Sequence, residues 1–163
     1  MNKQEHRLSQ IIMKIEVFSG LDLGEVQRIL NLCSPQKYAS NETVFEEGEN
    51  SEDMIILLSG KLKVIGKSGE ELSELSPGTA IGEMGILTGH SRSATVVSST
   101  PSSGLKIGRE PLKRLLDGDV GLRAKILSNM VDGLCQRLIE ANEHIEQFAK
   151  ESQIDQEAEE ALA

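Results

Sequence analysis

The sequence predicts a mainly β domain, a sandwich or roll, with helices at both ends. The hydrophobic periodicity is helical at first, then breaks into short runs cut by turns, and then becomes helical again. The 163 residues are enough for one domain with a real core. Because the only aromatic residues are three Phe and one Tyr, that core must consist mainly of Leu, Ile, Val and Met.

Residues 1–34 are expected to form a helical N-terminal segment. Their apolar residues recur at three- to four-residue spacing, as on one face of a helix: Leu8, Ile11, Ile12, Ile15, Val26, Ile29 and Leu30. Ser19 and Gly20 interrupt the pattern, so it predicts two short helices.

Residues 35–110 carry the pattern of the β domain. Short aliphatic and β-branched runs, among them MIILLS and ATVVSS, are separated by Gly, Asn, Ser and Pro. A compact sandwich or roll requires such frequent turns between short strands.

Residues 111–149 return to helical periodicity and are expected to form a hinge and two helices. Pro111 is a good first residue for a helix. Gly118 and Gly121 would permit a hinge, although glycines at a helix break need no function to explain them. The remaining residues, 150–163, are acidic and are expected to form a mobile tail.

The last helix carries a long apolar seam. Seven residues follow one another at alternating spacings of four and three, the a/d pattern of a coiled coil: Leu127, Val131, Leu134, Leu138, Ala141, Ile145 and Phe148. A second stripe of Leu122, Ile126 and Met130 would face the β domain. Because one stripe is then left for a partner, we expect a homodimer through Leu127–Phe148.

Charge and composition restrict the classes of partner. With 26 acidic and 17 basic residues and an isoelectric point near 4.9, the surface would repel a phosphate backbone, so no direct nucleic-acid partner is expected. The two cysteines lie far apart, which argues against a disulfide framework and fits a reducing compartment. The sequence shows no signal peptide and no apolar run of membrane length, so a soluble cytoplasmic protein is expected.

The stretch IGEMGILTGHSRSATV, residues 81–96, is the strongest candidate for a binding site. Backbone N–H groups of a turn at Gly82, Glu83 and Met84 can bind an anion, and the planar guanidinium of Arg92 matches two phosphate oxygens. Because an ionised Glu83 only accepts hydrogen bonds, it suits a hydroxyl such as a ribose 2′-OH. Taken alone, the pattern is explained more simply by a salt bridge between Glu83 and Arg92 across a turn.

Over residues 16–145 the chain resembles the cyclic nucleotide-binding domain family. The family's glycines occur in order, in VFEEGE, IILLSGKLKV and LSPGTAIGEMG. Residues 81–96 match the family's phosphate-binding cassette, with the acid and the arginine nine residues apart. The resemblance implies a β-roll or jelly roll, a double-stranded β-helix, with short N-terminal helices and a long C-terminal helix.

The resemblance also implies the contacts to a ligand. Glu83 would hold the ribose 2′-OH and Arg92 the cyclic phosphate, and the backbone of Gly82, Glu83 and the Ser93–Ala94 peptide would complete the cradle. The chain departs from the family pattern at Ser91 and Ile55, which replace a proline and a frequent aromatic residue, and neither change removes a ligand contact.

Three further positions bear on the base. Relatives with serine at the position of Ser93 include binders of cAMP and of cGMP, so the resemblance favours cAMP but leaves cGMP open. Arg137 and Asn142 on the last helix match positions that lie over the purine in bacterial activators. The alternative is that both are ordinary solvated positions of an amphipathic helix.

Together these features indicate a regulatory module that senses a cyclic nucleotide and signals through its C-terminal helix to a downstream protein. One alternative is a degenerate member that serves only as a dimerisation or scaffold domain, and another is a sensor of a different anionic small molecule. The sequence has no nucleophile motif, phosphate-binding Walker loop or histidine pattern for a metal, so no enzyme, cofactor or metal site is expected. It also shows no DNA-binding domain after the last helix.

Overall fold

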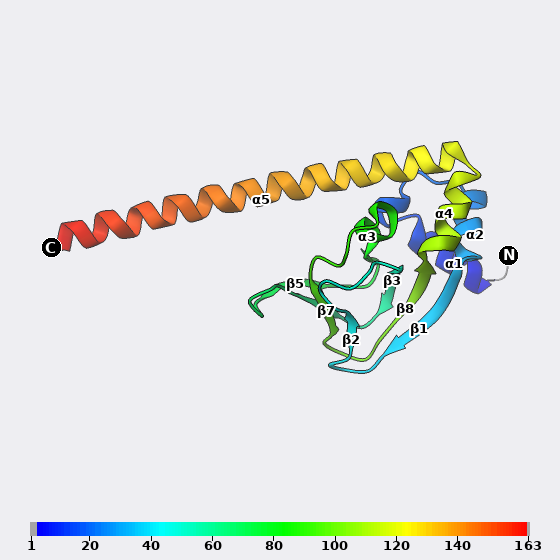
Figure 1. The fold of residues 1–163 in the computed structure, drawn as a ribbon, viewed down its shortest axis with the longest axis horizontal. Coiled ribbons are helices and arrows are strands. Elements are labelled where there is room, and N and C mark those ends of the chain that lie inside the picture. Colours follow the sequence, from blue (N-terminus) through cyan, green and yellow to red (C-terminus); the bar gives the residue numbers. More distant parts are fainter. Residues whose placement is uncertain (1–2, 163) are drawn as a thin grey trace. The chain divides into compact units, whose positions relative to one another are not determined.

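The computed structural model describes the backbone of residues 3–162 and the side chains of residues 5–150. It confirms a mainly β fold between helical ends (Figure 1). In chain order the elements are α1 (Lys3–Ile12), the 3-10 helix η1 (Glu16–Phe18), α2 (Leu23–Leu30), β1 (Cys33–Tyr38), β2 (Thr43–Phe45), β3 (Asp53–Ser59), β4 (Leu62–Ile65), β5 (Glu71–Leu75), β6 (Ala80–Ile81), α3 (Glu83–Thr88), β7 (Thr95–Ser98), β8 (Ser102–Gly108), α4 (Arg109–Asp117) and α5 (Val120–Leu162).

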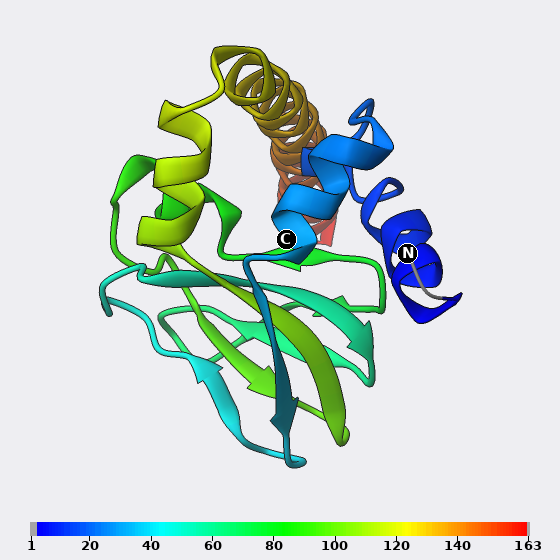
Figure 2. The same ribbon diagram turned by 90° about the vertical axis from the view of Figure 1, so that its right-hand side faces the viewer.

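Residues up to Asn129 form one compact unit, and residues from Met130 onward form a second. In the first unit the strands form two antiparallel four-stranded sheets, ordered β1-β8-β3-β6 and β2-β7-β4-β5. Helices α2 and α4 lie at one end of these sheets (Figure 2). The arrangement is the β-roll that the family resemblance implied.

Side chains from both sheets form the core of the roll: Phe45, Ile55, Leu57, Leu62, Ile81 and Val96. Strand β3 reads as a continuous apolar run because its other face is covered as well. Met54 and Ile56, which alternate with the core residues, are also buried. Helix α3 contacts β3, and α4 contacts the neighbouring β8.

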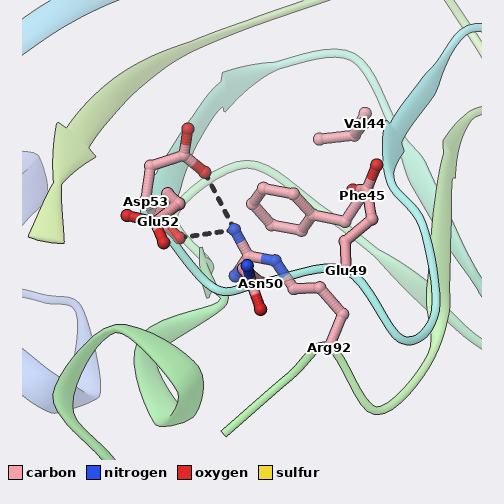
Figure 3. Close-up of a pocket in the computed structure, with 7 residues that line it drawn as sticks. All are labelled: Val44, Phe45, Glu49, Asn50, Glu52, Asp53 and Arg92. Carbon is pink, nitrogen blue, oxygen red and sulfur yellow. Dashed lines mark hydrogen bonds and ion pairs between the residues drawn. The ribbon is translucent and has the colours of Figure 1, made fainter. Parts of the chain in front are cut away.

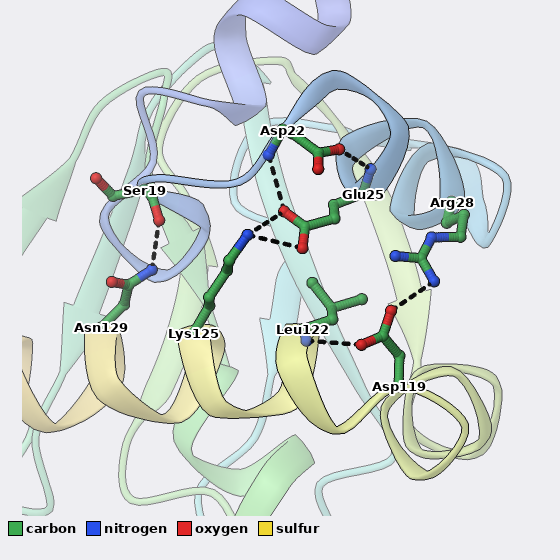
Figure 4. A network of polar contacts seen from close by, with 8 residues as sticks. All are labelled: Ser19, Asp22, Glu25, Arg28, Asp119, Leu122, Lys125 and Asn129. Carbon is green, nitrogen blue, oxygen red and sulfur yellow. Dashed lines mark hydrogen bonds and ion pairs between the residues drawn. The ribbon is translucent and has the colours of Figure 1, made fainter.

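A polar network ties the start of α5 to the N-terminal helices (Figure 4). Glu25 closes a capping box with Asp22 at the start of α2 and also accepts two hydrogen bonds, of 2.8 and 2.9 Å, from the Lys125 ammonium. Asn129 donates to the backbone oxygens of Val17 and Ser19 at 3.2 and 2.8 Å. The first ten residues of α5 are therefore held to the segment between η1 and α2.

Asp119, the residue before α5, makes two further contacts of this network. Its carboxylate accepts the Leu122 N–H at 2.9 Å, so it caps α5, and it pairs with Arg28 of α2 at 2.8 Å. The pKa of Asp119 is held below its ordinary value, mainly by the hydrogen bond from the Leu122 backbone and then by Arg28. Both contacts favour the ionised carboxylate and fix where α5 begins.

The break between α4 and α5 differs in detail from the sequence expectation. Helix α4 begins at Arg109, and Pro111 is accommodated at its third residue because first-turn N–H groups have no partner within the helix. Gly118 ends α4 at a φ of −83°, a value that any residue can adopt. Its conformation therefore does not require glycine, and the hinge role stays a prediction.

Helix α5 carries the two stripes that its sequence predicted. Within the first unit, Leu122 and Ile126 are buried whereas Leu127 is 42 % exposed. In the second unit, every described residue of the predicted seam is exposed: Val131, Leu134, Leu138, Ala141, Ile145 and Phe148. The helix continues to Leu162, through most of the predicted acidic tail. The side chains of residues 151–163 lie outside the described ones, so the mobility of that tail stays a prediction.

Candidate functional site

The centre of the candidate site is the buried side chain of Arg92, which is only 7 % exposed (Figure 3). Its guanidinium carbon lies 3.5 Å from the centre of the Phe45 ring, close enough for a cation–π interaction. Its Nη2 donates two hydrogen bonds to Asp53, to the backbone oxygen at 2.7 Å and to the carboxylate Oδ1 at 2.8 Å. Residues of strands β2 and β3 therefore hold the guanidinium of Arg92 in place.

The remaining polar atoms of this guanidinium have no protein partner. Nε and Nη1 of Arg92 are buried and make no hydrogen bond among the described residues. Burial lowers the pKa of Arg92 below its ordinary value, and the negative charge of Asp53 acts against that shift. A buried cation with two unused donor atoms is an incomplete site for an anion, because such donors are costly when they are left unpaired.

Gly82 lies close to Arg92, Phe45 and the backbone oxygen of Asp53. It precedes α3 in the left-handed conformation, with φ of 84°, which glycine adopts without strain. A side-chain carbon at Gly82 would collide with Nη1 of Arg92, and it would also come within 3.1 Å of the Phe45 ring. Glycine is therefore required here twice, once for the turn and once for the close approach of the guanidinium.

The loop between β2 and β3 lies alongside Arg92. The Arg92 N–H donates to the backbone oxygen of Glu49 at 2.8 Å, and the Gly48 N–H donates to the oxygen of Arg92 at 2.9 Å. A hollow of about 370 Å³ opens beside them, lined by Val44, Phe45, Glu49, Asn50, Glu52, Asp53 and Arg92 (Figure 3). The guanidinium is thus surrounded by acidic side chains of the loop as well as by an aromatic ring.

The structure brings together part of the predicted site. Gly82 touches Arg92, and Glu83 and Met84 follow as the first two residues of α3, with Glu83 half-buried and Met84 43 % exposed. Ser93 is exposed and Ala94 half-buried, directly after the arginine. The expected helical turn over residues 82–85 is present as the start of α3.

Arg137 and Asn142 belong to the second unit, where both are exposed. Their proposed contact with a base therefore stays a prediction. The simpler explanation of the pattern made Glu83 the salt-bridge partner of Arg92. The carboxylate that the structure shows bound to Arg92 belongs to Asp53.

Sequence reasoning missed Phe45, Asp53 and the acidic loop. Asp53 also has Lys106 at 3.8 Å, and with burial as the larger cause it helps to raise the pKa of Tyr38 to about 12. One signal was present, because the segment EEGENSED, residues 46–53, holds five acids and no basic residue. Asp53 is 39 positions from Arg92, and only the strand pairing brings the two together.

No group of three or more His, Cys, Asp or Glu side chains in the described part of the chain is arranged to hold a metal ion. No described helix has the length and apolar character that crossing a membrane requires.

Comparison with known proteins agrees with this geometry. Residues 35–119 match the model of a family described as the cyclic nucleotide-binding domain. "Glutaminase 2" of Bradyrhizobium diazoefficiens is 32 % identical over 132 residues, which are 80 % of this chain and 21 % of that protein. The chain therefore spans about a fifth of the length of this relative.

Two solved structures are also similar. A cyclic nucleotide-binding domain from Methylobacillus flagellatus has 25 % identity and a TM-score of 0.73, covering 85 % of this chain and 80 % of the other. The regulatory domain of Toxoplasma gondii PKA, solved with cAMP, has 25 % identity and a TM-score of 0.65, covering 70 % of this chain and 45 % of the other. The residues matched by the family model, 35–119, include the segment 81–96.

Proposed function

The chain belongs to the cyclic nucleotide-binding domain family, and we propose that it is a regulatory module that binds a cyclic nucleotide, cAMP in preference to cGMP. The segment 81–96 would form the binding site, and α5 would carry the response. The module would act without catalysis of its own, on a downstream protein in the cytoplasm. Both of its cysteines are free thiols, which suits a reducing compartment.

The observation that carries this proposal is the incomplete pairing of Arg92. Nη2 is held by Asp53, whereas Nε and Nη1 are buried and have no hydrogen-bond partner among the residues that the structure describes. A phosphate oxygen supplies the acceptors that these donors lack, and a charge-assisted hydrogen bond is about twice as strong as a neutral one. The cyclic phosphate would therefore be placed against Arg92, where Nε and Nη1 would donate to it.

The other cassette residues fit the remainder of a cyclic nucleotide. Glu83, the first residue of α3, would accept the ribose 2′-OH. The backbone of Gly82, Met84 and the Ser93–Ala94 peptide would add donors around the phosphate. Ser93 is exposed, so its hydroxyl is accessible to a base edge. The cAMP bound to the Toxoplasma gondii domain supports the preference for cAMP.

The output is proposed to run through a dimer. The seam on α5 leaves large apolar side chains exposed, from Leu127 at 42 % to Phe148 at 71 %. Heptad spacing over this length favours a coiled coil with a second copy of the chain. Arg137 and Asn142 flank that seam and would cover the base. Ligand would shift the placement of α5 only as far as it binds one placement more tightly than the other.

Calorimetric titration of the purified chain with cAMP and with cGMP tests the proposal directly. The parent should bind cAMP more tightly, and Arg92→Ala should lose at least tenfold in affinity, since it removes about 2–4 kcal/mol of charge-assisted contact. Arg92→Lys is the matched variant, because it keeps the charge but not the planar fork. A parent that binds neither nucleotide refutes the function. An Arg92→Ala variant with unchanged affinity refutes the site.

A further inference from the structure

The charge around Arg92 is strongly unbalanced. The hollow beside the guanidinium is lined by three carboxylates, those of Glu49, Glu52 and Asp53, and by one cation. Asp53 is paired with Arg92 at 2.8 Å. Among the side chains that the structure describes, Glu49 and Glu52 form no salt bridge, so the hollow holds three carboxylates and one guanidinium.

These two carboxylates are held near the cation by the backbone. The oxygen of Glu49 accepts the Arg92 N–H, and the Glu49 carboxylate accepts the Glu46 N–H at 3.1 Å within the same loop. The oxygen of Glu52 accepts the Arg109 N–H at 2.8 Å. Neither residue can move far from Arg92 unless the loop loses contacts to the segments on both sides of it.

Their fields also reach the guanidinium. After the larger effects of burial and of Asp53, the charges of Glu49 and Glu52 both act to raise the pKa of Arg92. The same fields would oppose any anion that approaches this group. An anion with one negative charge gains more from Arg92 than it loses to the more distant carboxylates. A second negative charge on the same phosphorus adds repulsion, while the protein offers no second cation among the residues that line the hollow.

We propose that Glu49 and Glu52 select the ligand by charge, admitting a singly charged phosphodiester and disfavouring a doubly charged phosphomonoester. The inference rests on the proposed function and concerns the same site. A phosphodiester such as a cyclic nucleotide carries one charge at neutral pH. A linear nucleoside monophosphate carries nearly two, because the second pKa of a phosphomonoester is about 6. The acidic loop thus distinguishes the cyclic ligand from the linear product of its hydrolysis.

The test compares ligands that differ in charge and little else. Adenosine 5′-monophosphate and its methyl ester have the same nucleoside and the same open phosphate, but the ester is a monoanion. Their affinities are measured at pH 7.5 by displacement of a fluorescent cyclic nucleotide from the parent and from the double variant Glu49→Gln, Glu52→Gln. Both residues are exposed, so the variant should fold. A control, Glu16→Gln with Glu143→Gln, removes the same charge from exposed positions outside the hollow.

In the parent, the methyl ester should bind more tightly than the dianionic monophosphate. In the double variant this ratio should fall by about three- to tenfold, as expected when two exposed charges each contribute a modest interaction. The control should keep the parent ratio. Raising the salt concentration from 0.05 to 0.5 M should narrow the ratio in the parent and change it little in the double variant, because salt screens exposed charges.

An unchanged ratio in the double variant, or an equal fall in the control, overturns the proposal. So does failure of both linear ligands to compete at millimolar concentration in parent and variant, since shape would then set the selectivity. Failure of the proposed function gives a different result, in which the parent does not bind the fluorescent cyclic nucleotide at all.

Discussion

The contact between Asp53 and Arg92 should compete with ligand, and Asp53→Asn should therefore bind a cyclic nucleotide more tightly. A guanidinium can grip two phosphate oxygens along either of two edges, and Nη2 belongs to both. In the structure Nη2 donates to the backbone oxygen and to the carboxylate of Asp53. A phosphate that binds along either edge must displace one of these acceptors.

The size of the effect follows from the type of bond that is lost. A hydrogen bond to a charged group contributes about 1.5–3 kcal/mol, and a neutral bond about 0.5–1.5 kcal/mol. Asparagine retains an acceptor oxygen but not the charge, so displacement should become easier by about 1 kcal/mol, or roughly fivefold in affinity. The same change should lower the free energy of unfolding by about 1 kcal/mol, because the hydrogen bond from Arg92 to a carboxylate becomes a bond to a neutral amide oxygen.

Calorimetry with cAMP and urea denaturation of the ligand-free protein measure the two effects. Glu42→Gln is a suitable control, since Glu42 shares the electrostatic environment of Tyr38 with Asp53 but is not among the residues that line the hollow. Tighter binding together with lower stability supports competition. Weaker binding would show that Asp53 instead orients Arg92 for the phosphate, and would refute competition between Asp53 and the ligand.

Three more outcomes are expected. Glu83→Gln should lower the affinity for cAMP several-fold and the affinity for its 2′-deoxy analogue little, as measured by calorimetry. Equal losses of affinity for both ligands would contradict the 2′-OH contact. The double variant Leu134→Glu, Leu138→Glu should sediment as a monomer and the parent as a dimer in sedimentation velocity. A parent that is monomeric at tens of micromolar would contradict the proposed dimer. Iodoacetamide at pH 8 should modify exposed Cys135 long before Cys33, because burial raises the pKa of Cys33 to about 12. Mass spectrometry of the modified chain measures the order, and modification of Cys33 before Cys135 would contradict this expectation.

Local patterns predicted a sandwich or roll, and the family resemblance then implied the β-roll and the candidate site. The change from helical spacing to short runs located the β-roll, because each strand has to alternate or be buried on both faces. Gly82 and Arg92 were predicted together because they belong to one short motif. Phe45 and Asp53 were not, since their approach to Arg92 depends on the pairing of β2 with β7 and of β3 with β8. Composition does not encode such register.

The contact between Lys125 and Glu25 was beyond prediction for the same reason. The residues are 100 positions apart, and each is individually an ordinary charged residue of an amphipathic helix. The exposed seam of α5, in contrast, was readable from spacing alone. Its purpose could not be read in the same way, because a stripe without a partner on the same chain looks identical whether it meets a second copy or another protein.

The polar contacts that anchor α5 fall on its first ten residues (Figure 4). At 1.5 Å per residue this part of the helix is about 15 Å long. Two of the links, Lys125 with Glu25 and Arg28 with Asp119, are ion pairs whose cations are partly exposed, so salt should weaken them. The hydrogen bonds of Asn129 to the backbone oxygens of Val17 and Ser19 involve no charged group and should persist. The start of α5 is therefore held by two kinds of contact that respond differently to ionic strength.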